Sequence, residues 1–244
     1  MSAFHNDLIY DVGLQNGGDT AYYLHQGYRV VAVEADPSVA DAGRARFANE
    51  IAAGRLTLLN VGIAETAGSS TFWICDRKPE WSSFHRRIAS RHGAAHHAIE
   101  IPTRPFADIL AEYGVPVYLK IDIEGNDPLC IRDLAAPLPK FVSVETECLG
   151  EEILLTESGS RATLDLLADR GYTKFKLIFQ RDFSSVQPDS PAVALAHDYP
   201  FKEGDSGPWG DETPGPWLSY DDAIAALARA VASKVESWHD WHAS

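Results

Sequence analysis

Acidic residues stand where two apolar runs end near the N-terminus. Asp11 lies near the end of the run Leu8–Val12, Gly13 follows that run directly, and Glu34 ends the run that begins at Tyr28. Two such runs, joined by a glycine-containing turn and a short helix, predict a βαβ unit whose strand ends bind a nucleotide. A carboxylate beside the first glycine disfavours a pyrophosphate and suits a cationic ligand. Glu34 is placed to accept hydrogen bonds from both hydroxyls of a ribose.

The glycine turn departs from the dinucleotide pattern Gly-x-Gly-x-x-Gly, because Gln15 stands where its second glycine would be. The turn therefore favours S-adenosylmethionine, with its amino and sulfonium groups near Asp11, over NAD. The alternative is that Asp11 only organises the turn. Asn60 to Gly62, after a third apolar run, either frame an adenine or form a plain strand-to-loop turn. The expected cofactor contacts are Asp11, Gly13, Asn16, Gly17, Thr20, Glu34, Ala35, Asn60, Val61 and Gly62.

A second group of charged residues lies in the predicted strand Val115–Ile123. Lys120, Asp122 and Glu124 alternate with isoleucines, so they share one face of the strand near its carboxyl end. Either they carry chemistry there, or lysine and carboxylate simply neutralise each other. Glu145, near the end of a later strand, either faces Asp122 and raises the pKa of one carboxyl or is a loop cap or a solvated side chain.

No metal site is expected from the histidines or the cysteines, since neither set has a ligand spacing. His85 is either a base, a substrate contact or a surface histidine. The cysteines are expected to be reduced, buried thiols of a cytoplasmic protein. The residues in question are His85, His92, His96 and His97, and Cys75, Cys130 and Cys148.

Apolar strands and short helices alternate up to residue 180, and this pattern predicts a doubly wound, mostly parallel α/β sheet. Such a sheet would position the acidic residues at its strand ends. We expect one domain over residues 1–244, with a core over 1–180. An irregular substrate-side loop and a C-terminal helix over Asp221–Val235 make up 181–244, and the last residues fray. The tryptophan-rich stretch 205–218, with Trp209, either contacts a substrate, closes as a lid or packs on the core.

Composition excludes several classes of partner. The chain of 244 residues carries a formal net charge of −14, which disfavours duplex nucleic acid and anionic membranes. Its N-terminus lacks the pattern of a signal peptide, and no apolar run approaches the length of a membrane span. A small neutral or cationic molecule is the expected partner, and the oligomeric state stays open.

Together these stretches resemble the FkbM family of S-adenosylmethionine-dependent methyltransferases. The resemblance implies a class I methyltransferase fold of the Rossmann-like type, with the cofactor held by Asp11, Gly13 and Glu34. It also implies O-methylation of a hydroxyl on a sugar, polyketide or related small metabolite. The loop from Gln15 to Asp19 departs from the usual alanine-containing loop. The matching stretches are Ile9–Gly13 with Gly17–Thr20, Val31–Pro37, Ser82 and Ser83, Leu119–Gly125 and Phe141–Glu145.

The expected mechanism is in-line methyl transfer assisted by a carboxylate base. Asp122 or Glu124 takes the hydroxyl proton, Lys120 shapes the local charge, and Glu145 is the substitute base. Two alternatives remain: a protein of this fold that binds S-adenosylmethionine without turnover, and, less favoured, an NAD-dependent oxidoreductase. The expected substrate-side residues are Ser82, Ser83, His85 and Trp209.

Overall fold

A parallel sheet with the strand order β3-β2-β1-β7 forms the centre of the first unit, residues 1–138. The pairing sets Asp11 beside Lys120 and Glu34 beside Asn60. Because the strands are parallel, their carboxyl ends meet at one edge of the sheet, where ligands of such sheets bind. The strands are β1 (Phe4–Val12), β2 (Arg29–Glu34), β3 (Leu56–Asn60) and β7 (Val115–Ile121).

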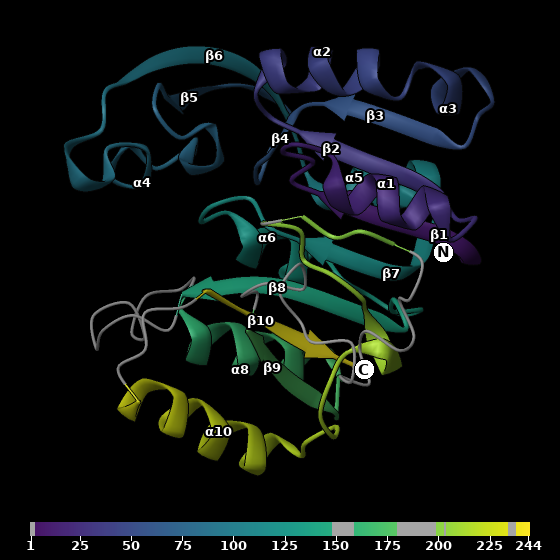
Figure 1. Cartoon of the computed structure of the whole chain (residues 1–244), viewed down its shortest axis with the longest axis vertical. Helices are drawn as coiled ribbons and strands as arrows, with labels where there is room; N and C mark the ends of the chain where they lie inside the picture. The colour runs from purple at the N-terminus through teal and green to yellow at the C-terminus, as the bar shows by residue number, and fades with distance from the viewer. Residues whose placement is uncertain (1–2, 148–158, 180–198, 203, 234–237) are drawn as a thin grey trace. The chain divides into compact units, whose positions relative to one another are not determined.

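The computed structural model describes residues 3–147, 159–179, 199–202, 204–233 and 238–244 (Figure 1). Cys148 therefore lies outside the described residues, as do residues 181–198, the first part of the expected substrate-side loop. No helix within the described part of the chain is long and apolar enough to cross a membrane.

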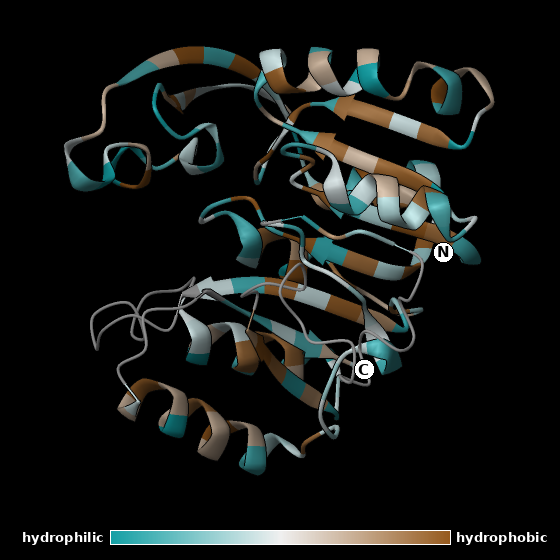
Figure 2. Ribbon diagram, viewed as in Figure 1, coloured by the Kyte–Doolittle hydropathy of each residue, from teal (hydrophilic) through white to brown (hydrophobic). Residues whose placement is uncertain are grey.

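Hydrophobic sequence explains why β1 and β7 are central strands. Leu8–Val12 and all of β7 are buried, and Figure 2 shows the hydrophobic residues concentrated in the strands. Asp36 begins the second helix, because its carboxylate accepts a 2.8 Å hydrogen bond from the Ser38 N–H, and Pro37 follows it. The helices of this sheet are α1 (Gly18–His25), α2 (Pro37–Arg46), α3 (Ala48–Ala52), α5 (Phe106–Tyr113) and α6 (Asp127–Arg132).

The sequence predicts two additional strands over 69–75 and 97–101, and a small second sheet in the same unit confirms both. Its strand order is β4-β6-β5, with β5 and β6 antiparallel. Short helical segments join β5 to β6. The elements are β4 (Gly62–Ile63), β5 (Gly68–Cys75), η1 (Pro79–Trp81), α4 (Arg86–Ala89), η2 (Arg91–Gly93) and β6 (His96–Arg104).

The second unit, residues 139–244, has strands in the order β8-β10-β9, with β10 antiparallel to both neighbours. Helix α8 packs on β8 and β10, and α10 packs on β9. The elements are β8 (Phe141–Glu147), α8 (Ser160–Arg170), β9 (Phe175–Phe179), η3 (Gly210–Glu212), α10 (Tyr220–Ala232) and β10 (Trp238–Ala243).

The structure corrects two sequence predictions. The C-terminal residues do not fray: they form β10, in which Trp241 is buried and donates a 2.8 Å hydrogen bond to the Ser160 carbonyl. The Ala- and Arg-rich sequence after Pro37 predicts one helix over 38–52, but Phe47, with a φ of −106° and a ψ of 26°, ends α2. The predicted α/β class with a Rossmann-like arrangement is confirmed.

Candidate cofactor and acceptor site

The turn after β1 depends on Gly13, which has a φ of +100°. A Cβ there would lie 1.9 Å from the Asp122 carbonyl oxygen, so only glycine lets the turn pass the end of β7. The N–H groups of Gly13 and Leu14 both donate to the Val33 carbonyl, at 2.9 and 3.1 Å. The turn is therefore bound to the ends of β2 and β7 through its backbone.

The remainder of the turn leads into α1 and is ordered by its own side chains. Asn16 Oδ1 accepts a 2.7 Å hydrogen bond from the Gly18 N–H, and the carbonyl of Asn16 accepts a hydrogen bond from Arg46. Gly17 has a φ of +74° and lies against the Phe47 ring, where a Cβ would come within 2.7 Å. The structure thus assigns Asn16 and Gly17 to the shape of the turn.

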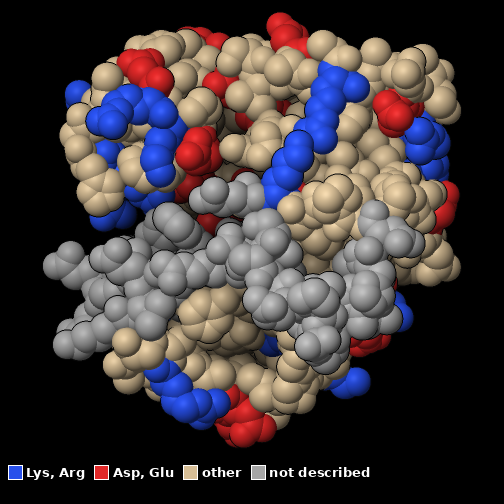
Figure 3. Space-filling view, in the orientation of Figure 1, with Lys and Arg blue, Asp and Glu red and all other residues tan. Residues whose placement is uncertain are grey.

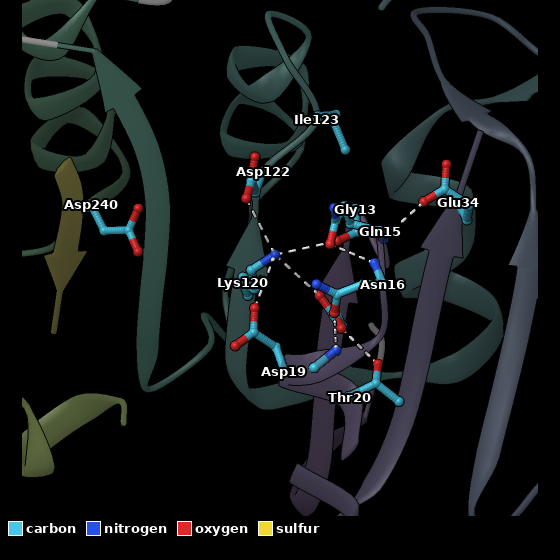
Figure 4. Close-up of polar contacts among 12 residues, drawn as sticks. Gly13, Gln15, Asn16, Asp19, Thr20, Glu34, Lys120, Asp122, Ile123 and Asp240 are labelled. Atoms are coloured by element: carbon cyan, nitrogen blue, oxygen red, sulfur yellow. Dashed lines mark hydrogen bonds and ion pairs between the residues drawn. The ribbon is translucent and has the colours of Figure 1, made fainter. Parts of the chain in front are cut away.

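Lys120 is the centre of a buried charged cluster, which we define as Asp11, Asp19, Lys120 and Asp122 (Figure 4). Its ammonium nitrogen lies 3.4 Å from Asp11 Oδ1, 3.5 Å from Asp19 Oδ2 and 3.5 Å from Asp122 Oδ2. It also donates to the Gly13 carbonyl at 3.3 Å. One cation thus neutralises only part of the charge of its neighbours, which suits a further positive group.

Burial is the main influence on the pKa of Asp11. This carboxyl is fully buried, which raises its pKa, while the nearby Lys120 ammonium and a 2.6 Å hydrogen bond from Thr20 Oγ1 oppose that rise. Asp11 Oδ1 has no hydrogen-bond donor within the structure, although the Lys120 cation lies near it. A buried carboxylate oxygen with spare acceptor capacity fits a cationic ligand.

Glu34 is held at the end of β2 by two backbone N–H groups. Gln15 N donates to Oε2 at 3.0 Å and Asp36 N donates to Oε1 at 2.8 Å. Each carboxylate oxygen keeps acceptor capacity for a hydroxyl, because each can accept more than one hydrogen bond. Burial raises the pKa of Glu34 to about 7, in spite of these two hydrogen bonds. Its neighbour Ala35 is partly exposed.

The residues after β3 have structural contacts of their own. Asn60 Nδ2 donates to the carbonyls of Glu34 and Ala35, at 2.8 and 3.2 Å, and so joins the ends of β2 and β3. Val61 follows, and a Cβ on Gly62 would lie 2.3 Å from the Phe84 ring. The predicted contacts of Asn60, Val61 and Gly62 with an adenine stay a prediction.

The segment after β7 is bound to the loop between β5 and β6. Ser83 Oγ donates to the Glu124 carbonyl at 2.6 Å and accepts a 2.9 Å hydrogen bond from the His85 N–H. The His85 ring lies 3.0 Å from Asn126 Oδ1. Arg91 lies 3.1 Å from the Glu124 carboxylate, whose residue has a φ of +54°. The structure therefore brings Ser83, His85 and Glu124 together.

Three predicted site residues, Ser82, Trp209 and Glu145, lie apart from this group or have other contacts. Ser82 Oγ accepts a 3.1 Å hydrogen bond from the Cys75 N–H, which stabilises the start of its loop. In the second unit, Trp209 is largely buried and its ring lies edge-on to Phe141, at 5.7 Å between ring centres. Trp209 therefore packs on the core of that unit, one of the alternatives left open by the sequence. Glu145 is partly exposed on β8.

Sequence reasoning missed several residues of this site. The sequence suggests Asp19 only as a cap of the helix that follows the turn, yet it contacts Lys120. Asn126 was overlooked, although it follows the Ile-Glu-Gly segment directly, and its Nδ2 donates to the Ile63 carbonyl at 2.8 Å. Within the described residues no group of His, Cys, Asp or Glu is arranged to hold a metal ion.

Comparison with known proteins gives a family match. A model of the methyltransferase FkbM domain matches residues 11–173, about two thirds of the chain. This range includes the glycine turn, Glu34 and the charged cluster. A search of curated proteins finds no match.

Several solved methyltransferase structures are similar to the chain at low identity. The C-terminal domain of precorrin-6Y C5,15-methyltransferase from Rhodobacter capsulatus is 13% identical, with a TM-score of 0.44 over 98% of this chain and 80% of that one. Geranyl diphosphate C-methyltransferase from Streptomyces coelicolor A3(2), with S-adenosyl-L-homocysteine bound, is 10% identical, with a TM-score of 0.44 over 100% and 75%. An O-methyltransferase from Bacillus cereus is 14% identical, with a TM-score of 0.40 over 71% and 67%.

The residues of this site fit the expected cofactor. Family membership rests on the domain match rather than on these structural likenesses. The partly unneutralised Asp11 carboxylate suits a cationic group, and the doubly anchored Glu34 suits a pair of hydroxyls. The chain belongs to the FkbM methyltransferase family and is a methyltransferase with S-adenosylmethionine as its cofactor.

Proposed function

We propose that the chain is an O-methyltransferase that acts on a hydroxyl group of a small molecule. The observation that carries this proposal is the placement of Asp122. Asp11 and Asp19 of the charged cluster are buried, whereas the Asp122 side chain keeps 29% of its surface exposed. Asp122 follows the end of β7, at the edge where open α/β sheets bind their ligands.

Four residues are proposed to hold the cofactor. Asp11 accepts its positive charge, Gly13 lets it approach the backbone, and Glu34 accepts the ribose hydroxyls. Thr20 keeps the Asp11 carboxylate in place through its 2.6 Å hydrogen bond. Asn16, Gly17, Ala35, Asn60, Val61 and Gly62 are proposed to complete the wall of this site.

Asp122 is the proposed base. S-adenosylmethionine supplies an electrophilic methyl group when it is bound, and a hydroxyl attacks such a group faster as it loses its proton. Asp122 can accept that proton, while Lys120 fixes the carboxylate from 3.5 Å. Glu124 is the weaker candidate because Arg91 lies 3.1 Å from its carboxylate.

The substrate-side residues take supporting parts in this proposal. Ser83 and Ser82 both use their hydroxyls within the protein, so they shape the loop that carries His85. The exposed His85 is the one proposed to contact an acceptor. Trp209 and Glu145 belong to the second unit, where Glu145 offers a partly exposed carboxylate.

The test is an incubation of the protein with isotope-labelled S-adenosylmethionine and a metabolite extract, followed by mass spectrometry. The expected result is one added methyl group on the oxygen of a small compound. Asp122→Asn should lower the transfer rate by roughly 10²–10⁴-fold, the usual contribution of a general base. Asp41→Asn is the control, since Asp41 forms an exposed ion pair with Arg44 on α2.

Three results would contradict the proposal. Transfer at the wild-type rate by Asp122→Asn would show that Asp122 is not the base. Binding of S-adenosylmethionine without transfer to any hydroxyl compound would favour a binding protein without turnover. Binding of NAD in place of S-adenosylmethionine would favour an oxidoreductase.

A further inference from the structure

A polar face of the second unit contains a group of titratable residues that the proposed reaction does not yet use. In the antiparallel pairing, Asp240 of β10 lies opposite Glu145 of β8, and His242 lies opposite Ser143. His242 also lies opposite Lys176 of β9. Directly opposed residues share one face of a sheet, so these five side chains lie on the same face.

The other face of these strands is the one covered by helices. Trp241 donates to the Ser160 carbonyl at the start of α8, and Phe175 contacts Tyr220 of α10. His239 is on that face as well, with its ring 3.9 Å from the Phe179 ring. The polar residues therefore do not belong to the packing of α8 and α10.

His242 is the most unusual member of the group. It is 1% exposed, and among the residues that the structure describes neither of its ring nitrogens has a hydrogen-bond partner. Its Nε2 lies 4.0 Å from Asp240 Oδ2, too far for a hydrogen bond. A buried polar atom without a partner costs about 1–3 kcal/mol, so an imidazole in this state indicates a missing partner.

Burial also fixes the charge of this imidazole. It lowers the pKa of His242 to about 3, with the nearby Lys176 ammonium acting in the same direction. At neutral pH the ring therefore has one N–H donor and one nitrogen acceptor. Lys176 itself is engaged, because it donates to the Thr213 carbonyl and hydroxyl at 2.8 and 3.1 Å and lies over the Trp217 ring.

We propose that Asp240, His242 and Glu145 of the second unit bind two adjacent hydroxyl groups of a small polyol, as in a vicinal diol. One hydroxyl donates to the Asp240 carboxylate and accepts from the His242 N–H, and the second donates to Glu145. The inference concerns the second unit alone and goes beyond the proposed function.

Charge and donor count argue against other ligand classes. An anion would meet two carboxylates. An ammonium group only donates, so it would leave the His242 N–H without an acceptor. A hydroxyl both donates and accepts, and therefore pairs with the imidazole N–H and a carboxylate together. Glu145 is partly exposed, whereas Asp240 is 2% exposed, so Glu145 provides the open end of the site.

The experiment observes the imidazole nitrogens of His242 by NMR in the full-length protein with isotope-labelled histidine. The His242 signals are identified by their loss in His242→Gln. The probes are methyl glucoside, inositol and glycerol, with methylammonium and inorganic phosphate as ligands of the excluded classes. We expect at least one of the three polyols to shift the His242 signals in a saturable way. Methylammonium and phosphate should leave them unchanged.

The variants separate binding from folding. Asp240→Asn should weaken the polyol response by about tenfold, the loss expected for a hydrogen bond to a charged group. Glu145→Gln, at a partly exposed position, should weaken it as well and guards against a folding defect in Asp240→Asn. His239→Asn is the matched control on the opposite face of the same strand and should bind the polyol as wild type does.

Several outcomes would overturn the inference: no response of His242 to any polyol, a response to methylammonium alone, or polyol binding as strong as that of wild type in both Asp240→Asn and Glu145→Gln. Calorimetric titration of the same samples with S-adenosylmethionine tests the proposed function separately. Absence of cofactor binding there would count against the proposed function and would leave the polyol result standing.

Discussion

Two lysines, one in each unit, are equally buried but have different surroundings. Lys120 of β7 and Lys176 of β9 are each 4% exposed. Lys120 lies within 3.5 Å of three carboxylates, whereas Lys176 donates to neutral oxygens of Gly210 and Thr213. Burial lowers the pKa of Lys176, with the more distant Asp211 opposing that change.

The difference shows what each region is built for. A buried ammonium bonded to neutral oxygens holds a loop against a sheet, which is a structural task. A buried ammonium shared by three carboxylates leaves an excess of negative charge, which is costly without a ligand. The first unit therefore carries the features of a cofactor site. Its surface is not negative throughout, because Figure 3 shows Lys and Arg side chains gathered over α4.

Replacement of the two lysines should have the largest effect on the free energy of unfolding, and the two losses should differ most. Lys120→Met leaves three carboxylates without their cation and should lower the free energy of unfolding by about 3–5 kcal/mol. Lys176→Met should cost about 1–3 kcal/mol, because it leaves only neutral oxygens unpaired. Denaturant unfolding measures both. Equal losses would remove the distinction between the two regions.

The turn after β1 should be the next most sensitive position. Gly13→Ala places a Cβ against the Asp122 carbonyl and should cost about 2–4 kcal/mol, from strain at positive φ and from the overlap. Gly54→Ala is the matched control, with a φ of +68° and nothing within 4 Å of its Cβ. Thermal unfolding and cofactor titration follow both variants. A stable Gly13→Ala protein with normal cofactor affinity would refute the role of this turn.

The pH dependence of cofactor binding should follow Glu34. Its pKa is raised from 4.5 to about 7 by burial, so the carboxylate becomes fully ionised only above that value. Its contribution to the stability of the unliganded fold is present below its ordinary pKa and is lost as pH rises through about 7. Ribose hydroxyls donate best to the ionised form. S-adenosylmethionine should therefore bind about tenfold more tightly at about pH 8 than at about pH 6.

Calorimetry at several pH values measures this dependence. Glu34→Gln should bind S-adenosylmethionine more weakly, and its affinity should no longer rise with pH. A rise that persists unchanged in Glu34→Gln would assign it to another group.

Burial raises the pKa of the acid Glu34, and in the second unit it lowers the pKa of the base His242. The pKa of His242 is lowered from 6.5 to about 3, so the folded protein binds fewer protons there than the unfolded chain. Its contribution to stability is present above about pH 6.5 and is lost as pH falls toward about 3. Wild type should lose stability in acid more steeply than His242→Gln. Identical slopes would contradict the buried, neutral imidazole.

The smallest effect is expected at the loop that contacts the segment after β7. Ser83→Ala removes two hydrogen bonds and should cost about 1–2 kcal/mol, with methyl transfer more affected than cofactor affinity. Ser69→Ala, which removes an exposed hydrogen bond to Glu100, is the control and should leave transfer unchanged. An effect of Ser69→Ala on transfer as large as that of Ser83→Ala would show that Ser83 does not position this segment.

The sequence predicted most of the first unit because its signals are local. Buried β-branched strands, a proline at the start of α2 and acids at strand ends are each readable from neighbouring residues. Asp11, Gly13, Glu34, Lys120 and Asp122 were all expected near strand ends, and they lie there.

The missed features depend on contacts between distant residues. β10 has two histidines and an aspartate among six residues, so its composition does not indicate a buried strand. Only its pairing with β8 and β9 makes it one. Asp240 and His242 were therefore overlooked. The position of Asp19 beside Lys120 likewise follows from the turn that brings α1 to β7.

Calorimetric titration of wild type, Asp11→Asn and Glu34→Gln with S-adenosylmethionine tests most directly the claim that these two acids hold the cofactor. We predict saturable binding by wild type and at least about tenfold weaker binding by each variant, provided that both remain folded. Folding is checked by circular dichroism on the same samples. Absence of binding by wild type, or affinities unchanged in both folded variants, would contradict the account.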